Sequence, residues 1–201
     1  MTELVAGTNV SRDFVEFPSQ INEHWATCPE VLGSHALHFQ TGEPMPRALI
    51  DRVLRARKYN QAFAMVEFLA AAWVDMDIHL AAEPPADIAA FEQASLARLG
   101  MPPEIVMRHR PTQFAHIFGG DGYSASYYAY LWAQVLDHDG FAAFEEAGDV
   151  FDPAVARRLR EEVLERGNSR DPALSYRAFR GREPRIDALL RNRGLAAPGD
   201  S

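Results

Sequence analysis

The sequence predicts an all-α protein with little or no sheet, on three observations. Apolar residues recur at spacings of three and four along most of the 201 residues, as on one face of a helix. We find no convincing run of strict apolar and polar alternation, the pattern of a half-buried strand. Pro and Gly stand between the periodic runs, where they end one helix and begin the next.

The first half of the chain predicts three helices. The first opens at Pro18, which suits a first helical turn, and its apolar face runs through Ile21 and Trp25 to Leu32. A second helix is predicted over residues 47–57. The third, residues 59–80, is apolar on nearly every side around Glu67 and is therefore expected to lie centrally.

The second half begins with an amphipathic helix over residues 86–99. Residues 100–122 are rich in Pro, Gly and His and predict a long irregular connection, which in compact domains is more often functional than idle. Further helices are predicted over residues 123–147, 152–167, 172–179 and 184–193. We expect one helical domain over residues 1–195 and a disordered tail over residues 196–201.

Bulk properties exclude several classes of protein. The formal net charge of -8 argues against nucleic-acid binding, which needs a basic surface. No window reaches the roughly 20 apolar residues of a membrane span, and residues 1–12 lack the pattern of a secretory signal. A single cysteine, Cys28, is compatible with a reducing compartment, so the cytoplasm is the expected location.

A carboxylate at the start of the first predicted helix is a candidate metal ligand. Glu16 precedes Pro18, so its backbone is well constrained, and carboxylate oxygen is an accepted third ligand of catalytic zinc beside two His nitrogens. The residues alone leave a simpler alternative open, because acidic side chains are common at helix starts, where the helix dipole favours them.

A second candidate site is a His, a glycine loop and three tyrosines. Tyr123, Tyr127 and Tyr130 follow His116 at helical spacings, so that three phenols share one predicted helix face. Phenol donors can stabilise an oxyanion, and the His can bind substrate backbone or move a proton. The alternative is an aromatic core face behind an ordinary loop. A phosphate loop is excluded, since no Gly-Lys-Ser/Thr follows the glycines.

Both segments resemble the thimet oligopeptidase family of zinc metallopeptidases. Residues 7–25, GTNVSRDFVEFPSQINEHW, match every fixed position of the family segment that provides the third zinc ligand. Residues 116–132, HIFGGDGYSASYYAYLW, are similar to the family's His, glycine loop and tyrosines. The resemblance extends over about residues 7–195 and is greatest for the peptidyl-dipeptidase branch.

The resemblance implies a C-terminal helical portion of a zincin-like oligopeptidase that hydrolyses short peptides with one Zn²⁺. It assigns Glu16 as zinc ligand, Tyr127, Tyr130 and His116 as catalytic residues, and His116, Tyr123 and Tyr127 as substrate-binding residues. The family's His-Glu-x-x-His helix, with its two zinc ligands and general base, does not occur in the sequence. We therefore expect the chain to be inactive alone. It is either completed by a separate fragment with His-Glu-x-x-His, or a non-catalytic peptide-binding module.

Overall fold

A computed structural model describes residue 5 and residues 7–195; the tail predicted over residues 196–201 lies outside this range. The chain forms two compact units. The terminal unit comprises residues 1–59 and 132–201, and the middle unit comprises residues 60–131. The prediction of one domain over residues 1–195 stays a prediction, and each unit is described by itself.

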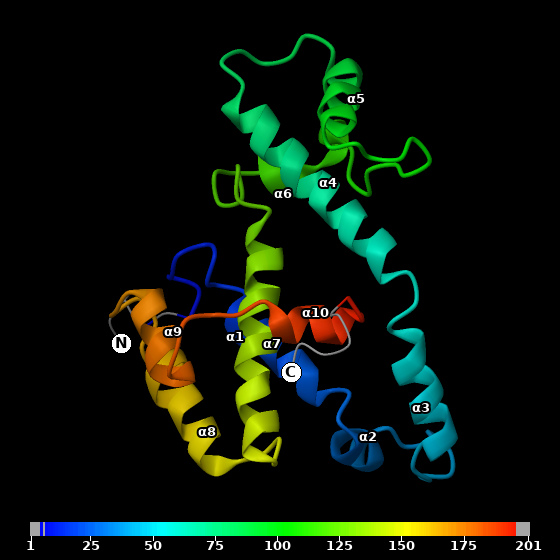
Figure 1. Ribbon diagram of the computed structural model, residues 1–201, viewed down its shortest axis with the longest axis vertical. Helices are drawn as coiled ribbons and strands as arrows, with labels where there is room; N and C mark the ends of the chain where they lie inside the picture. The colour runs from blue at the N-terminus through cyan, green and yellow to red at the C-terminus, as the bar shows by residue number, and fades with distance from the viewer. Residues whose placement is uncertain (1–4, 6, 196–201) are drawn as a thin grey trace. The chain divides into compact units, whose positions relative to one another are not determined.

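The terminal unit is built from α1 to α3 and α7 to α10 (Figure 1). The bounds of these helices are Phe17–Trp25 (α1), Pro29–His35 (α2), Arg47–Ala56 (α3), Ala129–Ala147 (α7), Pro153–Leu159 (α8), Pro172–Arg180 (α9) and Asp187–Arg193 (α10). A π-helical turn, Arg160–Leu164, directly continues α8, and residues 129–131 of α7 belong to the middle unit.

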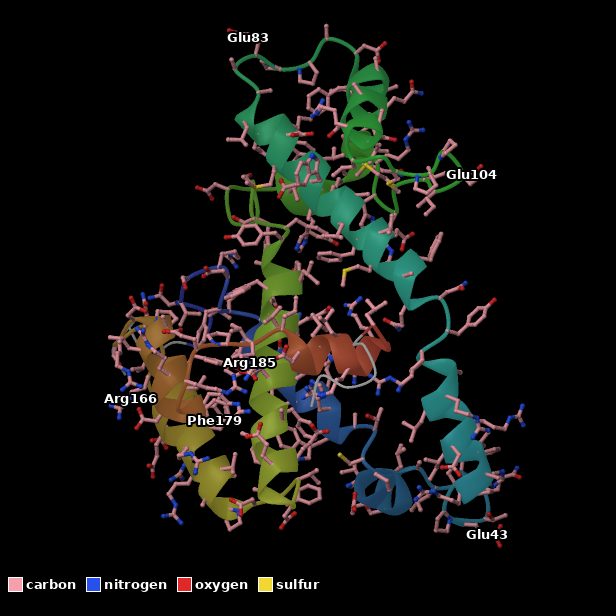
Figure 2. The ribbon with its side chains drawn as sticks, viewed as in Figure 1. Glu43, Glu83, Glu104, Arg166, Phe179 and Arg185 are labelled. Carbon is pink, nitrogen blue, oxygen red and sulfur yellow. The ribbon has the colours of Figure 1, made fainter. Side chains whose placement is uncertain are left out.

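The middle unit contains α4 (Gln61–Leu80), α5 (Ile88–Arg98), a 3-10 turn (Pro111–Gln113) and α6 (Ala115–Phe118). Figure 2 shows the exposed Glu83 in the loop that follows α4 and the exposed Glu104 in the loop that follows α5. Within the described range the extended pairing is one isolated bridge, Leu37 to Pro44. The predicted all-α fold is confirmed.

The predicted helix from Pro18 to Leu32 is wrong as a single element. It forms two helices, α1 and α2, with a break at residues 26–28. The cause is Pro29, since proline disfavours a helical backbone in the residue before it. Cys28 accordingly has an extended backbone, with ψ of 137°, and Pro29 begins α2.

The prediction that α4 is buried on nearly every side is also wrong. Its alanine side, including Ala70, Ala71 and Val74, packs against Met107, Phe114 and Ile117 of the same unit. On another side of α4, the Leu69 side chain is 43% exposed and the Trp73 side chain 49% exposed. The described packing partners of α4 within the unit lie on the alanine side.

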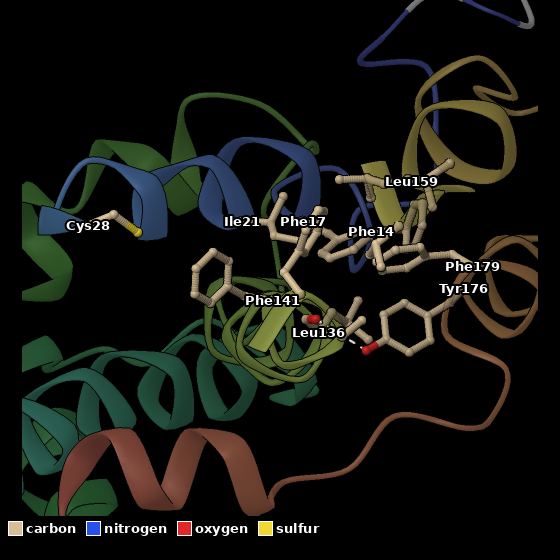
Figure 3. Packing of buried hydrophobic residues seen from close by; sticks show 13 residues of the cluster. Phe14, Phe17, Ile21, Cys28, Leu136, Phe141, Leu159, Tyr176 and Phe179 are labelled. Atoms are coloured by element: carbon tan, nitrogen blue, oxygen red, sulfur yellow. Dashed lines mark hydrogen bonds between the residues drawn. The ribbon is translucent and has the colours of Figure 1, made fainter. Parts of the chain in front are cut away.

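The terminal unit has its own core, in which α1 crosses α7. Figure 3 shows Phe17 and Ile21 of α1 directed at α7, with Tyr176 and Phe179 of α9 beside them. Phe17, Ile21 and Tyr176 are at most 1% exposed. Gly140 allows the close approach, since a Cβ at this position would lie 3.1 Å from Ile21 Cδ1 and from the Phe17 ring.

A buried carboxylate fastens α9 to α7. Asp139 of α7 accepts hydrogen bonds from the Tyr176 hydroxyl at 2.7 Å and from Arg182 Nη2 at 2.5 Å. Burial, together with this bond to Asp139, raises the pKa of Tyr176 far above its ordinary value. The pair is therefore a neutral donor facing a charged acceptor, the stronger class of hydrogen bond.

No helix in the described part of the chain is both long and apolar enough to cross a membrane.

We predict that Gly140→Ala destabilises the chain. Gly to Ala inside a helix ordinarily stabilises by about 0.5–1 kcal/mol, but overpacking a core typically costs about 1–3 kcal/mol. Phe17 and Ile21 are 0% exposed and cannot move aside freely. We expect a net loss of about 1 kcal/mol in urea unfolding.

The matched control is Gly33→Ala in α2, where an added Cβ meets nothing within 4 Å. This change should stabilise by about 0.5–1 kcal/mol, the ordinary helix effect. If both variants gain stability equally, α1 and α7 do not pack at Gly140 as described.

Candidate functional site

Glu16 is held at the start of α1 by the aromatic residues on either side of it. Phe14 and Phe17 are buried in the terminal core, with ring centroids 5.4 Å apart. The Glu16 carbonyl accepts hydrogen bonds from Ser19 Oγ and from the Gln20 amide, both at 2.9 Å. The side chain is half-buried on this fixed backbone, as a ligand that must not move requires.

The four residues predicted at the second site lie together in the middle unit. His116 Nε2 is 2.8 Å from the Tyr130 hydroxyl. The His116 ring lies 4.4 Å from the Tyr123 ring and 5.8 Å from the Tyr127 ring, between centroids. Tyr123 stacks on Tyr130 at 5.4 Å and 3°. The aromatic group of His116 and the three tyrosines is therefore one contiguous cluster.

The predicted helical face of tyrosines is nevertheless wrong. The helix predicted from residue 123 begins at Ala129, so Tyr123 and Tyr127 lie in turns and Tyr130 alone lies in α7. Ala125, between them, has φ of +53°. A left-handed conformation costs a non-glycine residue about 1–3 kcal/mol, so the turn persists only because surrounding contacts fix it. The tyrosines converge through this turn, not through helical periodicity.

A cavity of about 370 Å³ opens beside the aromatic group. Its lining includes His116, Tyr127 and Tyr130, together with His109, Gln113, Phe114 and Ala115. The volume lies within the usual range for small-ligand sites. Tyr127 stacks on Phe68 at 5.2 Å, and burial raises the pKa of its phenol, which nearby Arg108 lowers to a lesser degree. The cavity thus combines apolar walls with neutral phenol donors.

Sequence reasoning missed Asp75, a carboxylate of α4 that is 0% exposed. Its Oδ1 accepts a hydrogen bond from the Ala125 amide at 3.0 Å, and its Oδ2 accepts one from the Tyr127 amide at 2.9 Å. The signal available in the sequence was an acidic residue inside an otherwise apolar stretch, since such a group must find partners when buried.

A second unforeseen group joins His24 of α1 to Asp137 and His138 of α7 in the terminal unit. Asp137 Oδ1 lies 2.9 Å from His24 Nε2 and also contacts His138 Nδ1. His138 Nδ1 is further bonded to the Gln134 carbonyl at 2.8 Å. Hydrogen bonds from the two imidazole rings to one oxygen of Asp137 account for this grouping without a metal ion. The cavity beside this group is lined by one basic residue, Arg191, and one acidic residue, Glu145.

Glu16 does not by itself form a catalytic zinc site in this chain. Such a site needs three protein ligands and an open position. In the described part of the chain, the group of metal-ligating side chains close enough to hold an ion consists of His24, Asp137 and His138, without Glu16. Glu16 therefore provides one carboxylate and lacks two further ligands.

Comparison with known proteins shows the family of this chain. The profile of Peptidase family M3 matches residues 2–195. Dipeptidyl carboxypeptidase of Salmonella typhimurium is 47% identical over 194 residues, which cover 95% of this chain and 28% of that protein. The Escherichia coli protein of the same name has the same identity and coverage.

Oligopeptidase A of Escherichia coli is 37% identical over 190 residues, which cover 94% of this chain and 28% of that protein. The chain thus spans little more than a quarter of the length of these relatives. The predicted resemblance is confirmed, and it covers 28% of the length of each of these relatives.

We predict that the Tyr127 phenol ionises above the ordinary tyrosine pKa of about 10. Since burial favours the neutral phenol in the folded state, this stabilisation is fully present below pH about 10 and is lost as pH rises through the higher folded value. A difference titration of phenolate absorbance between the wild type and Tyr127→Phe reports this one group. If the missing ionisation falls at or below pH about 10, the phenol is not buried as described.

Proposed function

The chain belongs to peptidase family M3, and we propose that it forms part of the active site of a zinc-dependent peptidase acting on short peptides. M3 peptidases are zinc metallopeptidases. The observation that favours this function most is the aromatic group of His116, Tyr123, Tyr127 and Tyr130 around a cavity of ligand size.

In the proposed role, the aromatic group holds the substrate and stabilises the transition state. A carbonyl oxygen that becomes an oxyanion needs donors placed in advance, and Tyr127 and Tyr130, which line the cavity, each have a phenol hydroxyl. One such donor can contribute about 3 kcal/mol. His116 is bonded to Tyr130, which orients the phenol, and Tyr123 covers the His116 ring. We assign His116, Tyr123 and Tyr127 to substrate binding and Tyr127, Tyr130 and His116 to catalysis.

Glu16 is proposed as the third ligand of the zinc ion. Its two partner ligands and the general base belong to the His-Glu-x-x-His helix of the family, which this chain does not contain. We therefore propose that the chain does not hydrolyse peptides alone and is completed by a polypeptide with that helix. The exposed Leu69 and Trp73, one helical turn apart on α4, support such a partner, since apolar patches on a soluble protein often mark interaction sites.

A second candidate function is a peptide-binding module without a metal. The observation that favours it is that all seven cavity-lining residues fall within residues 109–130 of the middle unit, so the cavity needs nothing from Glu16. This function predicts affinity for short peptides that does not change when zinc is removed.

The proposal is tested by mixing the chain with the part of Escherichia coli dipeptidyl carboxypeptidase that lies outside the matched region. We expect tight zinc binding and peptide cleavage in the mixture and neither with the chain alone. Glu16→Gln should abolish both, because an amide is a far weaker zinc ligand than a carboxylate. The matched control, Glu30→Gln, changes an exposed carboxylate of α2 and should retain both.

Cleavage by the chain alone, abolished by Glu16→Gln, would contradict the need for a partner. Peptide binding without zinc uptake in any mixture would favour the peptide-binding module.

A further prediction separates the phenols. In the active mixture, Tyr130→Phe should lower kcat by about 100-fold, the usual effect of losing one oxyanion donor. Tyr128→Phe is the control, since Tyr128 is 43% exposed and does not line the cavity. Equal activity of the two variants would remove Tyr130 from the catalytic group.

A further inference from the structure

The environment of Asp75 is unusual for a charged residue. It lies on the alanine side of α4 with no exposed surface, yet it is 50 residues from the nearer of the two amides that it binds. Each carboxylate oxygen accepts one backbone N–H of the turn, from Ala125 and from Tyr127. Burial of a carboxylate is tolerated only with such donors, so the two amides and the carboxylate depend on one another.

Other hydrogen bonds of the turn between Gly120 and Ala129 join residues that are close in sequence. Ser124 Oγ donates to the Ile117 carbonyl at 3.0 Å, and the Ser126 amide donates to the Tyr123 carbonyl at 3.0 Å. Both bonds are local in sequence. Asp75 therefore ties the backbone of this strained turn to α4 by hydrogen bonds on either side of the positive φ of Ala125, and the Tyr127 ring adds a contact to α4 by stacking on Phe68.

His79 holds the carboxylate from the other side. One turn further along α4, its Nδ1 lies 2.9 Å from Asp75 Oδ1 and 2.9 Å from the Asp75 carbonyl oxygen. The His79 ring also packs on Phe118 of α6, the helix that includes His116, with centroids 5.3 Å apart. Asp75 and His79 together thus contact both segments from which the aromatic group is built.

We infer that Asp75 is a positioning residue, which sets the places of Tyr123 and Tyr127 around His116 by binding the backbone of their turn. The expected effect on peptide binding rests on the proposed function. The positioning of the turn by Asp75 does not. Asp75 is not one of the residues that line the cavity and binds Tyr127 through its backbone amide, so its effect is exerted through the turn.

The test compares Asp75→Asn with Asp77→Asn in the full chain. Asp77 lies on the same helix, but its carboxylate binds Ser95 and Arg98 of α5. In Asp75→Asn an amide N–H₂ must face one of the two backbone N–H groups, so one bond is lost. We expect the amides of Ala125 and Tyr127 to exchange hydrogen about tenfold faster in Asp75→Asn and at the wild-type rate in Asp77→Asn.

Two further readings separate positioning from general loss of stability. The phenol titration of Tyr127 should move toward its ordinary range in Asp75→Asn alone, since a released turn exposes the ring. Affinity for a short unlabelled peptide, measured by calorimetry, should fall about tenfold in Asp75→Asn while Asp77→Asn matches the wild type.

Unchanged exchange of the two amides in Asp75→Asn, or equal acceleration in both variants, would overturn the inference. If Asp75→Asn does not fold, hydrogen exchange is measured in the wild type alone. The inference is then overturned if the amides of Ala125 and Tyr127 exchange as fast as an exposed loop amide. A wild type that binds no peptide, alone or in the mixture, while Asp75→Asn still accelerates exchange, would contradict the proposed function and leave the positioning intact.

Discussion

The buried carboxylate of Asp75 is the interaction on which the candidate site depends. Removing a carboxylate from water is expensive, and the expense is offset only if nearly every acceptor position finds a donor. Here the donors are two backbone amides of a strained turn and the ring of His79. The same contacts that make the burial tolerable also hold the turn in place. An aromatic group assembled from turns can be precise for this reason, although turns are ordinarily the mobile parts of a fold.

The terminal unit also has a buried carboxylate that is satisfied by hydrogen bonds, but it fixes helices and not a turn. Asp139 of α7 is 1% exposed and accepts bonds from Tyr176 and Arg182, which fix α9 and the segment after it. In this unit the carboxylate supports a packed aromatic core and fixes helices, while Asp75 fixes the backbone of a loop. Glu16 benefits indirectly, because Phe17, next to it, packs on Tyr176 at 5.5 Å. Core packing therefore gives the proposed ligand Glu16 a rigid backbone.

The sequence predicted the helices and failed at the turns, for physical reasons. Periodicity located α3, α5, α9 and α10, although α5 buries the polar residues Glu92 and Ser95. It extended a helix through Cys28 although Pro29 excludes a helical backbone there, a local rule that was available. It also placed Tyr123 and Tyr127 on a helix. That error could not be avoided from spacing, because the turn depends on an acceptor 50 residues away.

The grouping of the tyrosines was predictable only from the family resemblance, and the route by which they converge was not. A strained Ala125 has no signature in the sequence, whereas glycine at the same place would have indicated a turn. Glu16 is a similar case, since one acid before a helix says nothing about zinc until the neighbouring residues are matched to a family.

Binding and hydrolysis place different demands on this chain, so the two are separable. The cavity is lined entirely by residues 109–130, and its donors and walls come from one unit. In the proposed function, hydrolysis needs a metal for which this chain would offer Glu16, which lies outside the group of His24, Asp137 and His138. Peptide affinity would then depend on Asp75 and the turn, while turnover would depend on ligands from another polypeptide. A variant that loses turnover but keeps affinity, as expected for Glu16→Gln, and one that loses affinity, as expected for Asp75→Asn, would show this division directly.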